Sequence, residues 1–324
     1  MDDKISSAAE ASGSGQYHIP VLLEQTAEAM NIRQGGIYVD GTAGGGGHSA
    51  EILRQLGGTG RLIAIDRDPD AIAEVTRRLG HNPNITIVHS EYSRIREVLD
   101  ELEIAAVDGV LLDIGVSSHQ FDCAERGFSY HHDAPLDMRM SSEGTTAADL
   151  IAQLDWKQLA EIFSRYGEEK FSAAIAKSIC RKRETAPIET TAQLAEIISA
   201  AYPAAARRDG HPARKVFQAL RIAVNDELGE LERGLESAFR CLKTGGRLSV
   251  ITFHSIEDRI TKRAMAEWCK GCTCPPEFPV CVCGKKPRAK LALRHPASAT
   301  EEELARNPRS RSARLRVCEK LEEN

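Results

Sequence analysis

The sequence has no apolar run of 18 residues, and residues 1–16 hold Ser, Ala, Gly and acidic residues without an apolar centre. We therefore expect no membrane-spanning segment and no signal peptide, with residues 1–16 as a disordered leader. Nine cysteines are present, five of them within Cys269–Cys283. Without a secretory signal, reduced thiols or a bound metal are expected rather than disulfides, and the expected location is the cytoplasm.

An overall positive charge is also lacking. The formal net charge is −5, which gives no global nucleic-acid signature. Residues 285–316 depart from this balance, because ten Lys or Arg there face three Glu, a formal +7. Such a local excess is typical of a protein that binds a polyanion such as RNA, and a basic sheet edge is the alternative.

A glycine turn near the N-terminus organises the chain. Ile37–Val39 is a short apolar run typical of a buried strand, Asp40 and Gly41 end it, and the four glycines Gly44–Gly47 follow. From His48 the apolar spacing becomes helical. A strand, a glycine turn and a helix together indicate a site for a nucleotide-type ligand, with an empty tight turn as the alternative.

More buried strands are predicted at residues 61–66, 84–89 and 107–115. Asp66 ends the first of them, 19 residues beyond Gly47, where a carboxylate can bind ribose hydroxyls or cap a helix. Tyr92 follows the next strand, where it can pack on a purine or lie on the surface. Asp113 lies at the carboxyl end of the last, where an acid can accept hydrogen bonds from an amino group. Successive βα units predict a parallel sheet with right-handed crossovers.

The pattern from about Thr146 to Ala206 is helical without a strand signal, which predicts an inserted helical domain. Asp155 is expected to cap one helix, and Thr190 with Gln193 forms a capping box for another. Val216–Leu242 is predicted as one long amphipathic helix. Short basic runs that can contact phosphates or face solvent lie at residues 181–183, 207–208 and 214–215.

After that helix the chain returns to the sheet with a predicted strand over residues 247–253. His254 and Ser255 follow at its carboxyl end, so His254 is a candidate catalytic residue, with a structural histidine as the alternative. Two short β patterns, residues 290–294 and 314–319, are expected to close the sheet.

Two C-x-C pairs, Cys272 with Cys274 and Cys281 with Cys283, lie six residues apart. Four thiolates so spaced can close a tetrahedral zinc site, but structural zinc sites usually separate the cysteines of a pair by two or more residues. We therefore expect buried or redox-inert thiols in a loop and no metal.

The glycines alone do not distinguish a nicotinamide cofactor from S-adenosylmethionine, because Gly45–Ala50 also fits the pattern G-x-G-x-x-[GA]. A nicotinamide-dependent oxidoreductase leaves the helical insert and the basic segment unexplained. A non-catalytic RNA-binding protein with the same fold is the other alternative, and the intact glycine turn, Asp66 and Asp113 argue against it.

The wider string Val39–Ser49 closely resembles the cofactor motif of the bacterial 16S ribosomal RNA cytosine-N4 methyltransferases. The resemblance runs in order from about Tyr17 to Leu321 and is carried by residues 18–23, 64–69, 111–118, 125–129, 135–140, 217–225, 253–259, 272–284 and 307–313.

The resemblance implies a class I methyltransferase, with a Rossmann-like doubly wound α/β sheet and an inserted all-helical domain. It implies S-adenosyl-L-methionine as cofactor and, as acceptor, the exocyclic N4 amine of a cytidine in the decoding region of 16S ribosomal RNA. The partner is then the small ribosomal subunit or a late assembly intermediate, and no oligomeric state is implied. The expected division is a methyltransferase domain over residues 17–140 and 216–324, with the helical insert at 141–215.

The resemblance assigns residues of this chain to different parts of the cofactor. Gly46, Gly47 and His48 are expected to contact its methionine end and Asp66 its ribose. Tyr92 is expected at the adenine side, where it replaces the family's common phenylalanine and preserves stacking. Asp113 and Gln120 complete the cofactor set, whereas Gly44 and Gly45 are assigned only to the turn.

The expected chemistry needs a hydrogen-bond acceptor on the amine, because its lone pair is delocalised into the cytosine ring. Asp113 is the candidate, and His254 or Ser255 can share the role. DNA amino-methyltransferases carry an acidic or Asn residue followed by Pro-Pro-aromatic at this strand end, where this chain has Asp113-Ile-Gly-Val. The catalytic assignment to Asp113 and His254 is therefore a hypothesis.

Overall fold

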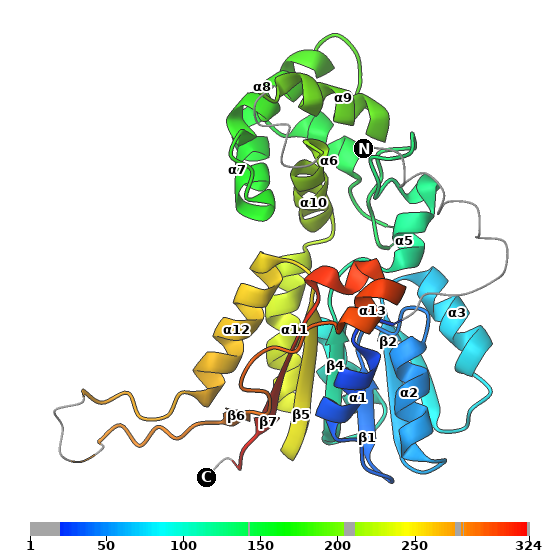
Figure 1. Ribbon diagram of the computed structural model, residues 1–324, viewed down its shortest axis with the longest axis vertical. Coiled ribbons are helices and arrows are strands. Elements are labelled where there is room, and N and C mark those ends of the chain that lie inside the picture. The colour runs from blue at the N-terminus through cyan, green and yellow to red at the C-terminus, as the bar shows by residue number, and fades with distance from the viewer. Residues whose placement is uncertain (1–19, 142, 204–210, 276–279, 281, 323–324) are drawn as a thin grey trace.

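The computed structural model describes residues 20–141, 143–203, 211–275, 280 and 282–322. A sheet flanked by helices forms the lower lobe in Figure 1, and a group of helices forms the upper lobe. The predicted leader, residues 1–16, and the basic pair Arg207–Arg208 lie outside the described residues. No helix in the described part of the chain has both the length and the apolar character needed to cross a bilayer.

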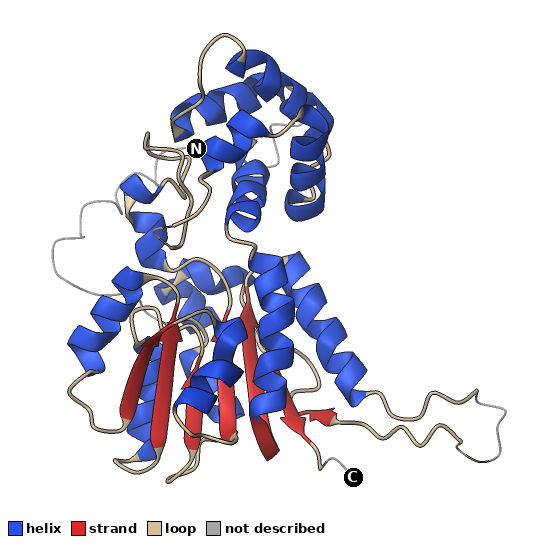
Figure 2. Ribbon diagram, turned by 180° about the vertical axis from the view of Figure 1, so that it is seen from behind, coloured by secondary structure: helices blue, strands red, loops and turns tan. Residues whose placement is uncertain are grey.

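The lower lobe is built on one seven-stranded sheet with the order β3-β2-β1-β4-β5-β7-β6, seen in red in Figure 2. Strands β1 to β5 run parallel, and β7 is antiparallel to both of its neighbours. This confirms the predicted doubly wound class I sheet. The strands are β1 (Ile37–Asp40), β2 (Arg61–Asp66), β3 (Ile85–His89), β4 (Val107–Asp113), β5 (Leu242–Thr252), β6 (Ala289–Leu291) and β7 (Arg314–Lys320).

Helices cover both faces of the sheet, and alternate strand residues pack on opposite faces. Tyr38 and Leu111 belong to the apolar cluster under α1 and α2, whereas Val39 and Leu112 belong to the cluster under α4, α11 and α12. The helices of this lobe are α1 (Leu23–Met30), α2 (Gly47–Leu56), α3 (Pro69–Leu79), α4 (Ile95–Glu101), α5 (Ser118–Asp122), α11 (Glu227–Cys241), α12 (Ser255–Cys269) and α13 (Glu301–Arg306).

The upper lobe has an apolar core of its own, formed by buried residues from Phe128 to Leu220. The predicted caps are present: Asp155 and Thr190 each accept from backbone N–H groups of the helices that they begin. The division at residues 141 and 216 stays a prediction. The helices are α6 (Ala147–Gln153), α7 (Trp156–Gly167), α8 (Ser172–Arg183), α9 (Thr191–Ala201) and α10 (Ala213–Val224).

The prediction of one helix over Val216–Leu242 is wrong, because the chain breaks between α10 and α11 at Asn225 and Asp226. Asp226 has the left-handed φ of 45°, which a continuous α-helix does not allow. The Asn225 side chain donates to the carbonyl of Met138 and accepts from the N–H of Met140, at 2.8 Å each. The chain therefore passes from the upper to the lower lobe at this break. There Asn225 also binds the segment that leads into the helical lobe.

Candidate active site

A cavity of about 1100 Å³ lies between the lobes, over the carboxyl ends of the parallel strands. This is the place that a doubly wound sheet provides for a ligand, since the strand order reverses between β1 and β4. The lower lobe contributes the turn after β1 and the ends of β2 and β4. The helical lobe and the C-terminal segment before β7 complete the wall. They contribute Tyr130, Arg214 and Phe217, and Arg309 and Ser312, respectively.

The glycine turn forms one wall of this cavity, and its glycines are required by the backbone. Gly46 has a φ of 77° and caps α2, and a Cβ on Gly47 would lie 2.9 Å from the Pro20 side chain. The Gly44 N–H donates to Asp66 Oδ2 at 2.8 Å. His48 follows in the first turn of α2, with Nε2 3.7 Å from Asp113 Oδ2. The turn is thus shaped to let a ligand approach the backbone.

Three acids are each the last residue of a strand: Asp66 and Asp113 line the cavity, and Asp40 lies fully buried behind its wall. Burial raises the pKa of Asp40 to about 6 and the pKa of Asp66 to about 6. Burial, with the charges of Asp40 and Glu257 nearby, raises the pKa of Asp113 to about 8. A cluster of buried carboxyls with raised pKa values favours a ligand that carries positive charge or N–H donors.

Asp113 is the acid best placed to contact a ligand. Its N–H donates to Thr42 Oγ1 at 2.7 Å, which fixes the end of β4 against the turn after β1. Its Oδ1 is buried and makes no hydrogen bond to the described residues. A buried acceptor without a partner is costly, so this oxygen fits a ligand that donates a hydrogen bond.

Asp40 is a buried acid behind the cavity wall whose structural role the sequence reasoning missed. It is fully buried, and its Oδ2 accepts from Ser49 Oγ at 2.6 Å, which links β1 to α2. The signal was present, because Asp40 follows a buried strand in the same way as Asp66 and Asp113. An acid at the end of each of three buried strands is the pattern that indicates a shared role.

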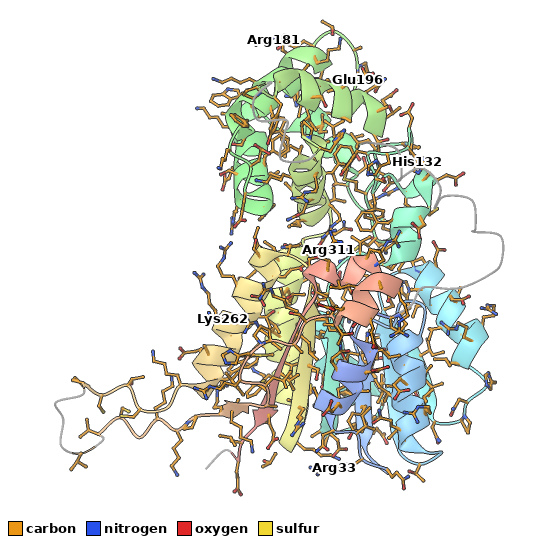
Figure 3. All side chains as sticks on the ribbon, viewed as in Figure 1. Arg33, His132, Arg181, Glu196, Lys262 and Arg311 are labelled. Carbon is orange, nitrogen blue, oxygen red and sulfur yellow. The ribbon has the colours of Figure 1, made fainter. Side chains whose placement is uncertain are left out.

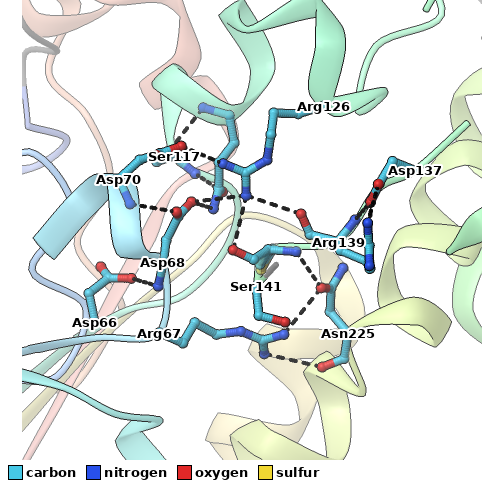
Figure 4. Close-up of polar contacts among 12 residues, drawn as sticks. Asp66, Arg67, Asp68, Asp70, Ser117, Arg126, Asp137, Arg139, Ser141 and Asn225 are labelled. Carbon is cyan, nitrogen blue, oxygen red and sulfur yellow. Dashed lines mark hydrogen bonds and ion pairs between the residues drawn. The ribbon is translucent and has the colours of Figure 1, made fainter. Parts of the chain in front are cut away.

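A polar network extends from the end of β2 to the start of the helical lobe (Figure 4). Asp66 Oδ1 accepts from the Asp68 N–H at 2.9 Å, and Asp68 in turn caps α3. Gln120 Nε2 donates to Asp68 Oδ2 at 2.5 Å. Gln120 therefore lies at the cavity, where the sequence predicted it, and it is held by the loop that carries the ribose-binding candidate.

Arg126 and Arg67 complete the network and were not predicted. Arg126 donates to Asp68 Oδ2 at 3.2 Å and to the carbonyl of Met140 at 2.9 Å. Arg67 donates to Asn225 Oδ1 at 3.1 Å. Together they connect the loop after β2 to Met140, where the chain enters the helical lobe, and to Asn225, where the chain leaves it. The position of the helical lobe is therefore coupled to the ligand cavity.

The geometry matches what the comparisons with known proteins show. The MraW methylase family matches residues 15–321. The chain belongs to this family. It is 56% identical to the ribosomal RNA small subunit methyltransferase H of Symbiobacterium thermophilum, over 94% of this chain and 97% of that protein. The protein of the same name from Paenibacillus sp. (strain JDR-2) is 53% identical, over 94% of this chain and 99% of that protein.

As a member of the MraW methylase family with a class I fold, the chain is a methyltransferase whose cofactor is S-adenosylmethionine. The cavity fits that group, since it combines a glycine turn, an acid at the end of β2 and a buried acceptor at the end of β4. Which residues hold each part of the cofactor stays a prediction.

Tyr92 opens the 3₁₀ turn η1 (Tyr92–Arg94) and lines the cavity, but most of its ring is buried between the sheet and α11. The ring lies against Gly234 in α11, where an added Cβ would approach it to 2.3 Å. Its phenol is shielded from water, and burial raises its pKa well above the usual value. If Tyr92 contacts the adenine as predicted, it does so with the edge of a ring that core packing holds in place.

His254 lines the cavity and caps α12. Its Nδ1 accepts from the Glu257 N–H at 3.4 Å, and its Nε2 lies 2.9 Å from Glu257 Oε1. Only Nδ1 is therefore hydrogen-bonded to Glu257, which is fully buried, whereas His254 Nε2 makes no hydrogen bond to the described residues despite its short distance to Oε1. The structural alternative accounts for these contacts, and a catalytic role for His254 stays a prediction.

Replacing Gly234 with alanine is expected to destabilise the fold by about 1–3 kcal/mol, because the new methyl group overlaps the Tyr92 ring. In a helix without this contact, Gly→Ala stabilises by about 1 kcal/mol, so the sign of the change isolates the overlap. Urea unfolding measures it, with Glu232→Ala on the exposed face of the same helix as control. Equal or greater stability of Gly234→Ala contradicts this packing.

Part of the basic excess in residues 285–316 is neutralised by ion pairs. Arg309 pairs with Asp122 at 2.6 Å, and Arg316 pairs with Asp258 at 2.7 Å. In the helical lobe, Arg183 donates to the carbonyls of Ile151 and Leu154, a structural role. Arg311 and Arg314 remain exposed, and Arg311 lies at the boundary between the lobes, as labelled in Figure 3.

Proposed function

We propose that this chain transfers a methyl group from S-adenosylmethionine to the N4 amine of a cytidine in the decoding region of 16S ribosomal RNA. Membership of the MraW methylase family and the names of its relatives support methyl transfer to small-subunit ribosomal RNA. The resemblance described above supports the N4 position. The cytoplasm is the proposed location, since ribosomes are assembled there.

The observation that carries the proposal is the buried Oδ1 of Asp113, which makes no hydrogen bond to the described residues. The amine of cytosine is a poor nucleophile because its lone pair is delocalised into the ring. An acceptor on one N–H localises that pair on nitrogen while the amine attacks the methyl carbon in line. The new N–C bond forms as the S–C bond breaks, and the methylated amine then loses a proton to the Asp113 carboxylate, which passes it to solvent.

Transfer to N4 rather than to carbon 5 of cytosine is also supported by the residues around the cavity. Carbon 5 becomes nucleophilic only after a thiolate adds to carbon 6 of the ring, which needs a cysteine at the base. Among the described residues, those that line the cavity include no cysteine. Asp113 provides instead the acceptor that an amine requires.

For the cofactor, we propose the assignment made from the motif. S-adenosylmethionine supplies an electrophilic methyl group on a positively charged sulfur when bound. Gly46, Gly47 and His48 hold the methionine end, Asp66 accepts from the ribose hydroxyls, and Tyr92 lies at the adenine side. Asp113 and Gln120 complete the cofactor set. These residues all line the cavity or lie in its glycine turn.

The RNA partner is proposed to enter between the lobes, because the cavity opens where both lobes and the C-terminal segment meet. The target base must leave its stack to reach the cofactor, which favours a folded small subunit or a late assembly intermediate as substrate. The test is methyl transfer from labelled cofactor to small subunits that lack the modification, beside naked 16S RNA. Label on the subunits supports the proposal, and no label on either RNA contradicts it.

Replacing both Arg311 and Arg314 with alanine is expected to weaken binding of the subunit about tenfold at moderate salt. Two lost phosphate contacts also reduce the slope of log K against log salt by about 1.5. Filter binding at several salt concentrations measures both, and turnover at saturating subunit concentration is expected to stay unchanged. Arg33→Ala with Lys262→Ala, two exposed positions labelled away from the cavity in Figure 3, is the charge-matched control. An equal loss in that control contradicts a specific contact.

A further inference from the structure

A second cluster of reactive side chains lies outside the cavity, in the segment between α12 and β6. This segment, residues 270–288, is named the cysteine arm here. Figure 1 shows it leaving the end of α12 that is remote from the boundary between the lobes. Within it the sulfur atoms of Cys272, Cys274 and Cys283 all lie within 4.8 Å of one another. Two come from the outgoing run of the arm and one from the returning run.

The sulfur spacing matches a metal site and not a disulfide. Cys272 Sγ and Cys283 Sγ are 3.7 Å apart. In a tetrahedral zinc site with Zn–S bonds of about 2.3 Å, adjacent sulfurs are about 3.8 Å apart, whereas a disulfide needs about 2.05 Å. Bringing all three sulfurs to that spacing requires shifts of only about 1 Å.

Backbone N–H groups point at the same sulfurs. The Cys274 N–H donates to Cys272 Sγ, the Thr273 N–H to Cys283 Sγ and the Val282 N–H to Cys274 Sγ, each at 3.4 Å. A metal-bound sulfur accepts hydrogen bonds of this kind, so the arrangement is compatible with sulfurs that bind a metal. Lys285, two residues after Cys283, pairs with Glu267 at 2.7 Å.

Exposure excludes the alternative that these thiols serve as core residues. Cys272 and Cys283 are exposed and Cys274 is half-buried, so of the expected buried or redox-inert thiols in a loop, burial is wrong for Cys272 and Cys283. Cysteines without a ligand are among the most buried residues, and no residue of the arm that the structure describes is buried in an apolar core that could replace a metal. A thiolate cluster that joins the two runs supplies that missing stabilisation.

We propose that Cys272, Cys274 and Cys283 bind one structural Zn²⁺ ion that holds the two runs of the cysteine arm together. Each thiol releases a proton to solvent as its sulfur–zinc bond forms, so binding strengthens as the pH rises. Cys281, the remaining cysteine of the two C-x-C pairs, lies outside the described residues. The described part of the arm leaves α12 on the side away from the boundary between the lobes in Figure 1, so the proposed role of the zinc is structural and separate from methyl transfer.

Metal analysis of the full chain, purified without chelator, is expected to give about one zinc per chain. After chelation under reducing conditions, titration with Co²⁺ is expected to give thiolate-to-cobalt charge-transfer bands and the visible bands of tetrahedral cobalt. The charge-transfer intensity counts the thiolates, and three or four support the proposal. Chelation is also expected to speed tryptic cleavage at Lys270 and Lys285, which flank the cluster.

Cys272→Ser and Cys283→Ser are expected to lose the metal and the cobalt bands. Cys180→Ala, in α8 of the helical lobe, is the matched control and is expected to keep both. Zinc-free protein without cobalt bands, fewer than three thiolates, or a Cys272–Cys283 disulfide in nonreducing peptide maps would each overturn the proposal. Metal content and spectra are read independently of methyl transfer, so failure of either proposal is recognised separately.

Discussion

Asp113→Ala is expected to lower turnover on the small subunit by about 10²- to 10³-fold, the loss typical of removing one preorganised group that stabilises a transition state. Affinity for S-adenosylhomocysteine is expected to fall far less than turnover, because Asp113 is one of seven residues assigned to the cofactor, whereas its buried Oδ1, which makes no hydrogen bond to the described residues, is assigned to the amine. Single-turnover transfer and calorimetry measure the two quantities. Normal turnover with intact cofactor affinity would refute the role of Asp113.

The pH profile distinguishes Asp113 from a residue that acts only through the fold. Because burial raises the pKa of Asp113 to about 8, its carboxyl is mostly protonated near neutral pH and ionised above that value. The ionised form is the stronger acceptor, so kcat/KM is expected to rise from about pH 7 and level off above about pH 9, one unit above the pKa of Asp113. Asp40 and Asp66, with pKa values of about 6, titrate below this window.

Asp113→Asn provides the matched comparison. Its side-chain carbonyl can still accept from the amine, so partial activity is expected, but the variant has no group that titrates at this position. A flat profile over the same pH range therefore supports Asp113 as the titrating group. An unchanged rise with pH in Asp113→Asn assigns the titration to another residue.

Asp66→Asn is expected to weaken S-adenosylhomocysteine binding on the order of 100-fold, the equivalent of two hydrogen bonds to a charged group at about 1.5 kcal/mol each. The reason is twofold. The proposed ribose contacts lose their charge, and the new amide opposes an N–H donor of either Gly44 or Asp68.

Calorimetry measures this affinity, and thermal unfolding without ligand separates it from a loss of fold. Asp100→Asn, at an exposed ion pair with Arg96 remote from the cavity, is the control and is expected to stay within about twofold of the unaltered chain. Unchanged affinity in Asp66→Asn would show that the ribose lies elsewhere.

The strands of the lower lobe were predictable from the sequence because parallel strands are buried on both faces. Each therefore appears as a short apolar run that ends in a polar residue, as in Arg61–Asp66. The glycine turn was predictable for a related reason. Glycine is favoured by the left-handed backbone at Gly46, where a Cβ would also lie 3.1 Å from Val75 and Leu79, and by the approach of Pro20 to Gly47.

The break at Asn225 was missed because apolar residues keep helical spacing on both sides of it. Asn225 and Asp226 were the available signal, since both residue types favour helix ends. The contacts of Arg126 with Asp68 and Met140 join segments far apart in the sequence, so no local pattern reports them. The exposure of Cys272 and Cys283 likewise depends on an arm whose course only the structure shows.

The most direct test of the proposed activity is the identity of the methylated nucleoside. Small subunits that lack the modification are treated with the enzyme and S-adenosylmethionine, and the 16S RNA is digested and analysed by mass spectrometry beside nucleoside standards. The account predicts N4-methylcytidine, formed by the unaltered enzyme and strongly reduced with Asp113→Ala. Methylation of carbon 5 of cytosine, of another base or of a ribose would contradict it.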